Sequence, residues 1–244
     1  MAVPVGAQGD GKKEHADESM NPGSDGKTIK LKLNLQRTRI KRIVTLPADI
    51  SLDDFNCIIQ DLFGFERKHL WKFKDREGNA YSDGNAAIGY ESNIMDKDYL
   101  LNPCDYTIAD VLRKYGDVLR YVYNYAEDWK IVITRMTDPR DDQIACVETI
   151  GTNAIEEVDG IWGLGELTEA LEIYEKEERA GKPHKDADRR IAKLGYDDAE
   201  KRKKFLAGPT KRGLTKLIRN EIDAIEERHR QCRDEAGRKR QRGE

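Results

Sequence analysis

Cysteine, histidine and serine supply most enzymatic nucleophiles and many metal ligands, and their spacing in this chain matches none of the common patterns. The four cysteines lie at least 42 residues apart, so none belongs to a C-x-x-C pair: Cys57, Cys104, Cys146 and Cys232. None of the four histidines has a histidine partner three or four residues away, and no serine stands in a Gly-x-Ser-x-Gly turn. We therefore identify no catalytic residue, no metal ligand and no cofactor-binding residue in the sequence.

A glycine-rich stretch, Gly160-Ile-Trp-Gly-Leu-Gly, is the other candidate for cofactor chemistry. A phosphate-binding loop needs G-x-x-x-x-G-K-[ST], or G-x-G-x-x-G after a strand, and the stretch has neither pattern. We interpret it as a turn followed by a helix start, with Trp162 buried in the core. The pair Asp53-Asp54 is interpreted as first-turn helix carboxylates, which the helix dipole favours, and not as an acid–base pair.

Three tyrosines alternate along a segment rich in aromatic and β-branched residues. On a strand, Tyr121, Tyr123 and Tyr125 would share one face. Facing solvent beside basic residues they could stack unpaired nucleic-acid bases, whereas facing inward they would form core. The opposite face is more polar, so we predict that the tyrosines are core residues, as are Trp71 and Trp129.

The net charge of −3 hides an uneven distribution. Residues 201–244 contain 15 Lys and Arg against 7 Asp and Glu, a net of +8, which leaves −11 on the first 200 residues. Such a tail can be an ordinary solvated helix, or it can contact nucleic acid or an acidic surface. The possible nucleic-acid contacts are Lys211, Arg212, Lys216 and Arg219. A smaller basic stripe could also contact phosphate or be solvated: Lys30, Lys32 and Lys41.

From Thr210 onward, apolar residues recur at helical spacing, which predicts an amphipathic helix of about four turns or more. Its apolar stripe consists of Leu214, Leu217, Ile218, Ile222 and Ile225. An exposed stripe of this kind is costly in water, so something must cover it. The candidates are the acidic body of the same chain, a second copy and a foreign protein.

Period-2 alternation predicts strands at 28–36 and 40–46, joined as a hairpin. A helix is predicted to begin at Ser51, to end at Gly64 and to pack on this hairpin. A strand at 69–73, a long loop at 76–106 and a short helix at 107–116 follow. Next come a second hairpin, made of strands 118–125 and 129–136, a short strand at 144–149 and helices after 163. The order β-β-α-β-α-β-β predicts an α+β fold, loosely similar to the β-grasp, with a mixed or mostly antiparallel sheet of four or five strands and a helical C-terminal extension.

Three stretches carry a family resemblance: IKRIVTLPADISLDDFNCIIQDLFGFERKHLWKF, YVYNYAEDWKIVI and DGIWGLGELTEAL. In this order they resemble the plasmid pRiA4b ORF-3-like family. The second is similar to the motif Tyr-x-Tyr-Asp-Phe-Gly-Asp-x-Trp-x-His-x-Ile, and the third to Gly-Gly-x-Trp-Gly-x-x-x-Leu. The positions aligned with these motifs are Tyr121, Tyr123, Asn124, Glu127, Trp129, Trp162 and Gly163.

The chain departs from the family motif at its polar positions. Asn124 and Glu127 stand where the family has aspartate, and Ile131 replaces the histidine. If the family residues formed an ionisable or metal-binding group, this chain has lost part of it, which argues against catalysis here. The resemblance implies an α+β fold and a plasmid or mobile-element setting for a family described as uncharacterised.

Residues 1–27 hold almost no large apolar side chain, so we expect a disordered segment there, then the family domain at 28–175 and a charged helical extension at 176–244. The lack of an apolar leader and of an apolar span of ~20 residues predicts a cytoplasmic protein with no membrane segment.

We rank first a non-enzymatic protein-interaction module that binds a partner or itself through the C-terminal amphipathic helix. A nucleic-acid-binding accessory protein that uses the basic helix is second, and an enzyme with an unrecognised site is third.

Overall fold

The computed structural model describes residues 28–82, 100–137, 139 and 142–242. The segment 1–27, predicted to be disordered, lies outside this description. The strands are β1 (Thr28–Leu35), β2 (Lys41–Pro47), β3 (Trp71–Lys74), β4 (Ala80–Tyr81), β5 (Leu100–Leu101), β6 (Val118–Tyr123), β7 (Trp129–Arg135) and β8 (Ala145–Ile150). The helices are α1 (Leu52–Phe63), the short 3₁₀ helix η2 (Pro103–Asp105), α3 (Ile108–Val111), α4 (Gly160–Arg179), α5 (Lys185–Lys193), α6 (Ala199–Ala207) and α7 (Lys211–Arg242).

The strands form one eight-stranded sheet in the order β5-β4-β3-β6-β7-β1-β2-β8. Every pairing between described strands is antiparallel except that of β4 with β5, which confirms the predicted α+β fold. The sheet is wider than the four or five strands expected. The extra strands β4 and β5 come from the predicted loop 76–106, of which residues 83–99 lie outside the description.

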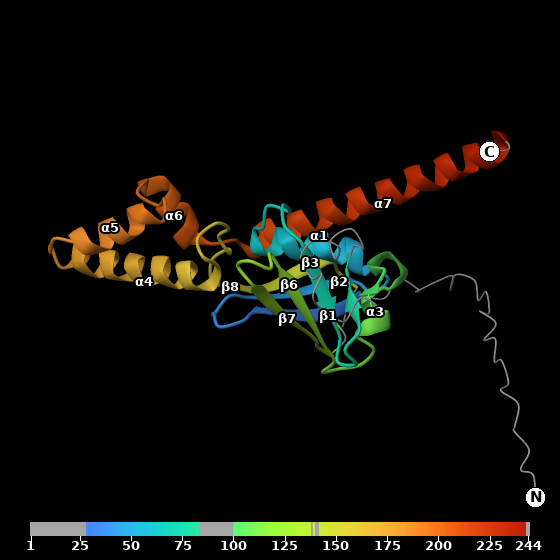
Figure 1. Cartoon of the computed structure of the whole chain (residues 1–244), viewed down its shortest axis with the longest axis horizontal. Coiled ribbons are helices and arrows are strands. Elements are labelled where there is room, and N and C mark those ends of the chain that lie inside the picture. The colour runs from blue at the N-terminus through green and yellow to red at the C-terminus, as the bar shows by residue number, and fades with distance from the viewer. Residues whose placement is uncertain (1–27, 83–99, 138, 140–141, 243–244) are drawn as a thin grey trace, which may run out of the picture.

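Helix α1 begins and ends where its sequence indicates. The Ser51 hydroxyl accepts a hydrogen bond from the Asp54 backbone N–H at 3.1 Å, and Gly64 ends the helix with a left-handed φ of 78°. A capping box between Thr107 and Asp110 starts α3 in the same way. Figure 1 shows α1 lying across one face of the sheet, so the two elements enclose a core between them.

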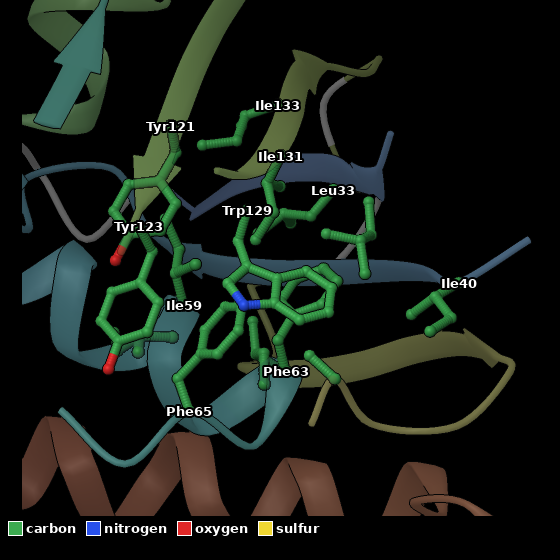
Figure 2. Packing of buried hydrophobic residues seen from close by; sticks show 14 of the residues in the cluster. Leu33, Ile40, Ile59, Phe63, Phe65, Tyr121, Tyr123, Trp129, Ile131 and Ile133 are labelled. Carbon is green, nitrogen blue, oxygen red and sulfur yellow. The ribbon is translucent and has the colours of Figure 1, made fainter. Parts of the chain in front are cut away.

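Aromatic side chains fill the space between α1 and the sheet. Tyr121, Tyr123 and Trp129 are fully buried, and the Tyr123 ring stacks on Phe65 with centroids 4.4 Å apart (Figure 2). Trp71 is only 9% exposed. The prediction that both tryptophans are core residues is therefore confirmed.

Tyr125 does not share the buried face of the other two tyrosines, so that part of the prediction was wrong. Strand β6 ends at Tyr123, and Tyr125 lies in the following turn with its ring half-buried. The ammonium group of Lys72 lies 5.0 Å from the centre of this ring. The alternation of the sequence continues past the end of the strand, but the chain has already left the plane of the sheet.

Helices α4, α5 and α6 form a helical arm at one end of the sheet (Figure 1). Residue 175, the expected domain boundary, lies within α4. The arm is held together by buried apolar residues, namely Leu167, Leu171, Ala187 and Ile191. None of the helices in the described part of the chain is both long and apolar enough to span a membrane.

Helix α7 packs against α1 and along strand β8, and then continues past the body of the protein (Figure 1). Four residues of its predicted stripe are buried in the main core: Leu214, Ile218, Ile222 and Ile225. Leu217, the fifth, is 44% exposed. The sequence left three candidates to cover this stripe: the body of the same chain, a second copy and a foreign protein. The body of the same chain is the one that covers it.

Candidate functional site

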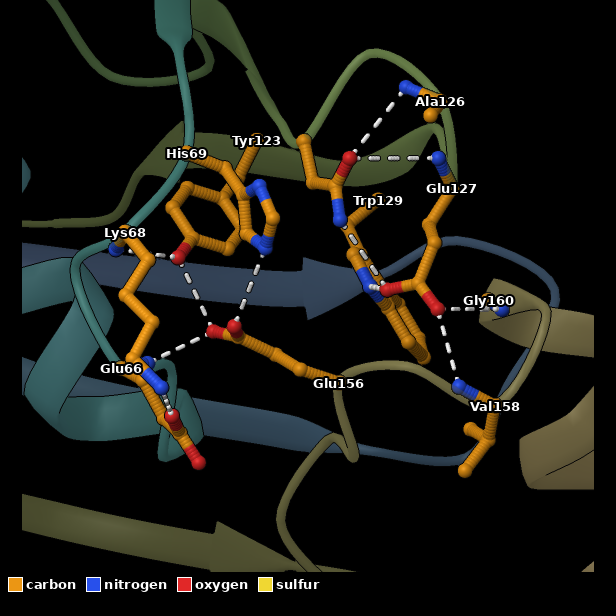
Figure 3. Close-up of polar contacts among 11 residues, drawn as sticks. Glu66, Lys68, His69, Tyr123, Ala126, Glu127, Trp129, Glu156, Val158 and Gly160 are labelled. Carbon is orange, nitrogen blue, oxygen red and sulfur yellow. Dashed lines mark hydrogen bonds and ion pairs between the residues drawn. The ribbon is translucent and has the colours of Figure 1, made fainter.

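The family-motif residues meet at the turn between β6 and β7, where the Glu127 carboxylate accepts four hydrogen bonds (Figure 3). On Oε2 the donors are the side-chain nitrogens of Asn124 at 3.2 Å and Trp129 at 2.9 Å. On Oε1 they are the backbone N–H groups of Val158 at 3.0 Å and Gly160 at 3.2 Å. Glu127 thus ties the β6–β7 turn to the first residue of α4.

Asn124 shapes that turn. Its φ of 51° is left-handed, a conformation that asparagine tolerates better than most residues. Its side-chain oxygen accepts hydrogen bonds from the backbone N–H of Ala126 at 3.3 Å and of Glu127 at 3.4 Å. The side chain that replaces the family aspartate therefore acts on the backbone of its own turn.

Two glycines allow close backbone contacts at the start of α4, Gly160 with this turn and Gly163 with the segment that precedes the helix. A Cβ on Gly160 would lie 2.4 Å from the carbonyl oxygen of Glu127, and one on Gly163 would lie 1.5 Å from that of Val158. Trp162 lies between them and is 72% exposed, so the prediction that it is buried in the core was wrong. With 3.6 residues per turn, the helix points position 162 away from the side on which 160 contacts the body.

A second carboxylate, Glu156, joins the segment before α4 to the segment before β3 (Figure 3). Its side chain is only 5% exposed. One oxygen accepts hydrogen bonds from the Tyr123 hydroxyl at 2.9 Å and the Glu66 backbone N–H at 2.6 Å, and the other lies 3.4 Å from Nε2 of His69. Burial and the hydrogen bond to Glu156 raise the pKa of Tyr123 to about 12.

These contacts give the motif residues a structural role. Glu127 accepts hydrogen bonds from protein donors on both carboxylate oxygens and Glu156 accepts them on one, whereas the second oxygen of Glu156 is buried without a hydrogen-bond partner among the described residues. Ile131, at the position of the family histidine, is fully buried. Across the described ranges, no group of three or more His, Cys, Asp or Glu side chains is arranged to hold a metal ion. The two carboxylates position the helical arm against the sheet.

The sheet face opposite α1 carries the other candidate residues. Cross-strand register places Lys74 opposite Arg120 and Lys32 opposite Thr134. Seven basic side chains, which we call the basic face, project on this side and are exposed or half-buried: Lys30, Lys32, Lys41, Lys72, Lys74, Arg120 and Lys130. Figure 1 shows no helix of the described chain lying over this face.

Lys41 and Lys130 of the basic face have carboxylate partners among the described residues. Lys41 pairs with Glu148 at 2.8 Å, and Lys130 pairs with Asp128, both at half-exposed positions. Such pairs are screened by water and hold the cations only weakly. No ion pair within the described residues involves Lys30, Lys32, Lys74 or Arg120.

The sequence indicated only part of this surface, the stripe of Lys30, Lys32 and Lys41. The residues contributed by β3, β6 and β7 were missed because they are far apart in the chain. Strand alternation already places each of them on one side of its own strand. Only the pairing of β3 with β6, of β6 with β7 and of β7 with β1 makes those sides one surface.

The four basic residues expected to contact nucleic acid from the tail lie in the first turns of α7 and are exposed: Lys211, Arg212, Lys216 and Arg219. Helix α7 runs along the outer edge of β8 here. The Thr215 hydroxyl accepts a hydrogen bond from the Cys146 backbone N–H at 3.0 Å, and Nε of Arg219 donates to the Ile144 carbonyl at 3.2 Å. Arg219 thus contacts the sheet edge, and side chains of α7 satisfy backbone groups that an edge strand would otherwise expose.

Comparison with known proteins places this fold in a family. The model of the plasmid pRiA4b ORF-3-like protein family matches residues 26–200, which include both motif segments and extend through α5. The crystal structure of the protein of unknown function MM3350 from Methanosarcina mazei Go1 is similar, with a TM-score of 0.53 and 19% identity over 70% of this chain and 91% of that chain. No curated protein matches the sequence. The chain belongs to the plasmid pRiA4b ORF-3-like family.

Proposed function

We propose that this protein binds nucleic acid, without catalysing a reaction on it, through the basic face of its sheet. The supporting observation is the concentration of charge. On a chain whose net charge is −3, seven cationic side chains gather on one face of one sheet. Ordinary surfaces intersperse both signs of charge, and a basic patch of this kind is the electrostatic footprint of phosphate binding.

The geometry of a sheet suits a phosphate backbone. Neighbouring strands lie about 4.8 Å apart and alternate residues of a strand about 6.7 Å apart, so the cations form a closely spaced array. Lys30 with Lys32, and Lys72 with Lys74, are such alternate pairs on β1 and β3. A nucleic-acid strand carries a negative charge at every nucleotide, so it can meet several of these cations at once and release its counterions.

A protein partner bound through the C-terminal stripe, the first-ranked sequence hypothesis, has less support. Leu214 and Ile218 are at most 2% exposed because α1 and β8 cover them. The stripe therefore offers no free apolar surface at these positions. The charge of the basic face favours a phosphate ligand, and an acidic protein surface is the alternative that the binding experiment must distinguish.

The experiment compares three triple variants that each remove three positive charges. The first is Lys32→Gln, Lys74→Gln and Arg120→Gln on the basic face. The second, Lys211→Gln, Arg212→Gln and Lys216→Gln, tests the start of α7. The control is Lys185→Gln, Lys193→Gln and Lys203→Gln, whose exposed side chains lie on the helical arm. Binding of labelled oligonucleotides is measured by fluorescence anisotropy over a range of salt concentrations.

We expect the basic-face variant to bind more weakly and to make the plot of log affinity against log salt less steep by about two to three, since each phosphate that the protein no longer neutralises removes about 0.7 to 0.9 from the slope. The arm control should keep the wild-type slope. If the α7 variant alone shows the reduced slope, the basic helix is the binding surface. If the wild type binds neither DNA nor RNA at low salt, the proposal is wrong and an acidic protein becomes the better candidate.

A further inference from the structure

The cations of the basic face form two groups on different strands. Strands β3 and β6 carry the first group, which we call bank A: Lys72, Lys74 and Arg120. Strands β1 and β2 carry the second group, bank B: Lys30, Lys32 and Lys41. Strand β7 lies between β6 and β1 in the sheet, so it separates the two banks.

Strand β7 places a neutral strip between the banks. On the basic face it presents Val132 and Thr134, both half-buried. The third residue of β7 on this side, Lys130, is paired with Asp128. The charge of the face is therefore concentrated on both sides of β7 and is weak along it.

The strand register fixes how far apart the banks lie. Five residues follow one another across the sheet as directly paired neighbours, in the order Lys74, Arg120, Val132, Asn34 and Lys41. Arg120 of bank A and Lys41 of bank B are thus three strand spacings apart, which is about 14 Å.

No aromatic ring belongs to the basic face along the described strands β1–β3 and β6–β8. Sheets that bind single strands stack unpaired bases on rings of the exposed face. The rings of β3, β6 and β7 point into the core instead and are at most 9% exposed: Trp71, Phe73, Tyr121, Tyr123 and Trp129. Valines occupy the basic face beside them, namely Val118, Val122 and Val132. Tyr125 lies in the turn after β6, where its ring already contacts the ammonium group of Lys72.

We infer, on the basis of the proposed function, that the ligand of the basic face is duplex DNA, with one phosphate backbone on each bank. A duplex keeps its bases paired and stacked, so it needs no aromatic rings from the protein. Its two backbones border a major groove about 12 Å wide, which is close to the spacing of the banks. A single strand would contact only one bank and would leave the charge of the other unused.

The experiment removes two cations from one bank at a time in the full-length protein. Lys74→Gln with Arg120→Gln changes bank A, and Lys30→Gln with Lys32→Gln changes bank B. The matched control is Lys185→Gln with Lys193→Gln on the helical arm. Each protein is titrated with a labelled DNA duplex of about 20 base pairs, two helical turns. One strand of this duplex and an RNA duplex of the same sequence are titrated in parallel, all over a range of salt concentrations.

The two-bank arrangement predicts that duplex DNA binds more tightly than either the single strand or duplex RNA. Each bank variant should make the salt dependence of duplex binding less steep by about two, since two phosphates of one backbone are no longer neutralised. The arm control should keep the wild-type slope. All three variants should keep the wild-type melting temperature, because the substituted side chains lie at the surface or are only half-buried.

The outcomes separate this inference from the proposed function. If the single strand binds as tightly as duplex DNA, or if only one bank changes the duplex slope, the inference is wrong and the proposed function stands. Equal affinity for duplex RNA would contradict the match to the DNA groove, because the major groove of an RNA helix is narrow. If no oligonucleotide binds at low salt, the proposed function itself fails.

Discussion

Nε of Arg42 donates a hydrogen bond to the carbonyl oxygen of Leu62 at 3.0 Å, so a fully buried guanidinium group on β2 closes the C-terminal end of α1. The remaining donors reach carbonyl oxygens of Ile150 and Thr152, each at 2.7 Å. One side chain thereby joins α1, β8 and the segment that leads to the arm. Burial lowers the pKa of Arg42 to about 10, the expected effect of removing a cation from water.

Replacing Arg42 by lysine should destabilise the protein by about 2–4 kcal/mol, since one ammonium group cannot reach carbonyls on three segments and leaves some buried without a donor. Urea unfolding measures this change. Arg120→Lys, at an exposed position, is the matched control and should change stability by less than about 0.5 kcal/mol. An equal loss in both variants would show that the buried hydrogen bonds are not what stabilises this junction.

Gly163→Ala should destabilise the protein by about 1–3 kcal/mol, because the added Cβ would meet the Val158 carbonyl at 1.5 Å and must displace the segment that leads into α4. Gly165→Ala, two residues later in the same helix, has open space around its Cβ. It should stabilise the helix by about 0.5–1 kcal/mol. Thermal melts of the two variants should therefore shift in opposite directions, and a shared direction would contradict the close packing at Gly163.

Ile218→Ala should cost about 2–5 kcal/mol, because this side chain is 1% exposed and its loss leaves a cavity between α7 and the body. Leu217→Ala, at the neighbouring position, removes a side chain that is 44% exposed and should cost much less. Chemical unfolding of the two variants tests whether the chain itself covers the stripe. Similar small losses would mean that α7 does not dock on the body in solution.

Stability should fall between pH 10 and pH 12 partly through Tyr123. Its pKa is near 10 when unfolded and is raised to about 12 in the folded protein, so the unfolded state loses the proton first. The contribution of this group is therefore fully present below pH 10 and is lost as the pH rises through 12. Tyr123→Phe should show a shallower decline than wild type over this interval.

The measurement is the free energy of unfolding in urea at several pH values for both proteins. The difference between the two curves isolates Tyr123, because Arg42 and the other tyrosines titrate in both. Parallel curves from pH 9 to pH 12 would contradict the raised pKa. Absorbance of tyrosinate in the folded wild type provides an independent check.

The local elements and the family are predictable from the amino-acid sequence. Ser51 marks the start of α1 and Gly64 its end, because capping depends on residues within one turn. The strand at Thr28–Leu35 follows from the alternation of apolar and polar residues alone. The burial of Trp129 and the apolar stripe of α7 were also predictable, since periodicity selects the face of an element that needs cover.

The neighbours of each face depend on long-range packing, which the sequence patterns do not specify. Trp162 is exposed because Gly160 faces the body, where it contacts Glu127 in a turn more than 30 residues earlier. The stripe of α7 could have met a partner, and it meets α1 and β8 instead. Lys32, Lys74 and Arg120 lie on one surface only because β1, β7, β6 and β3 pair in that order. Local sequence signals set the period of an element, whereas long-range pairing sets its neighbours. The proposed binding surface depends on those neighbours.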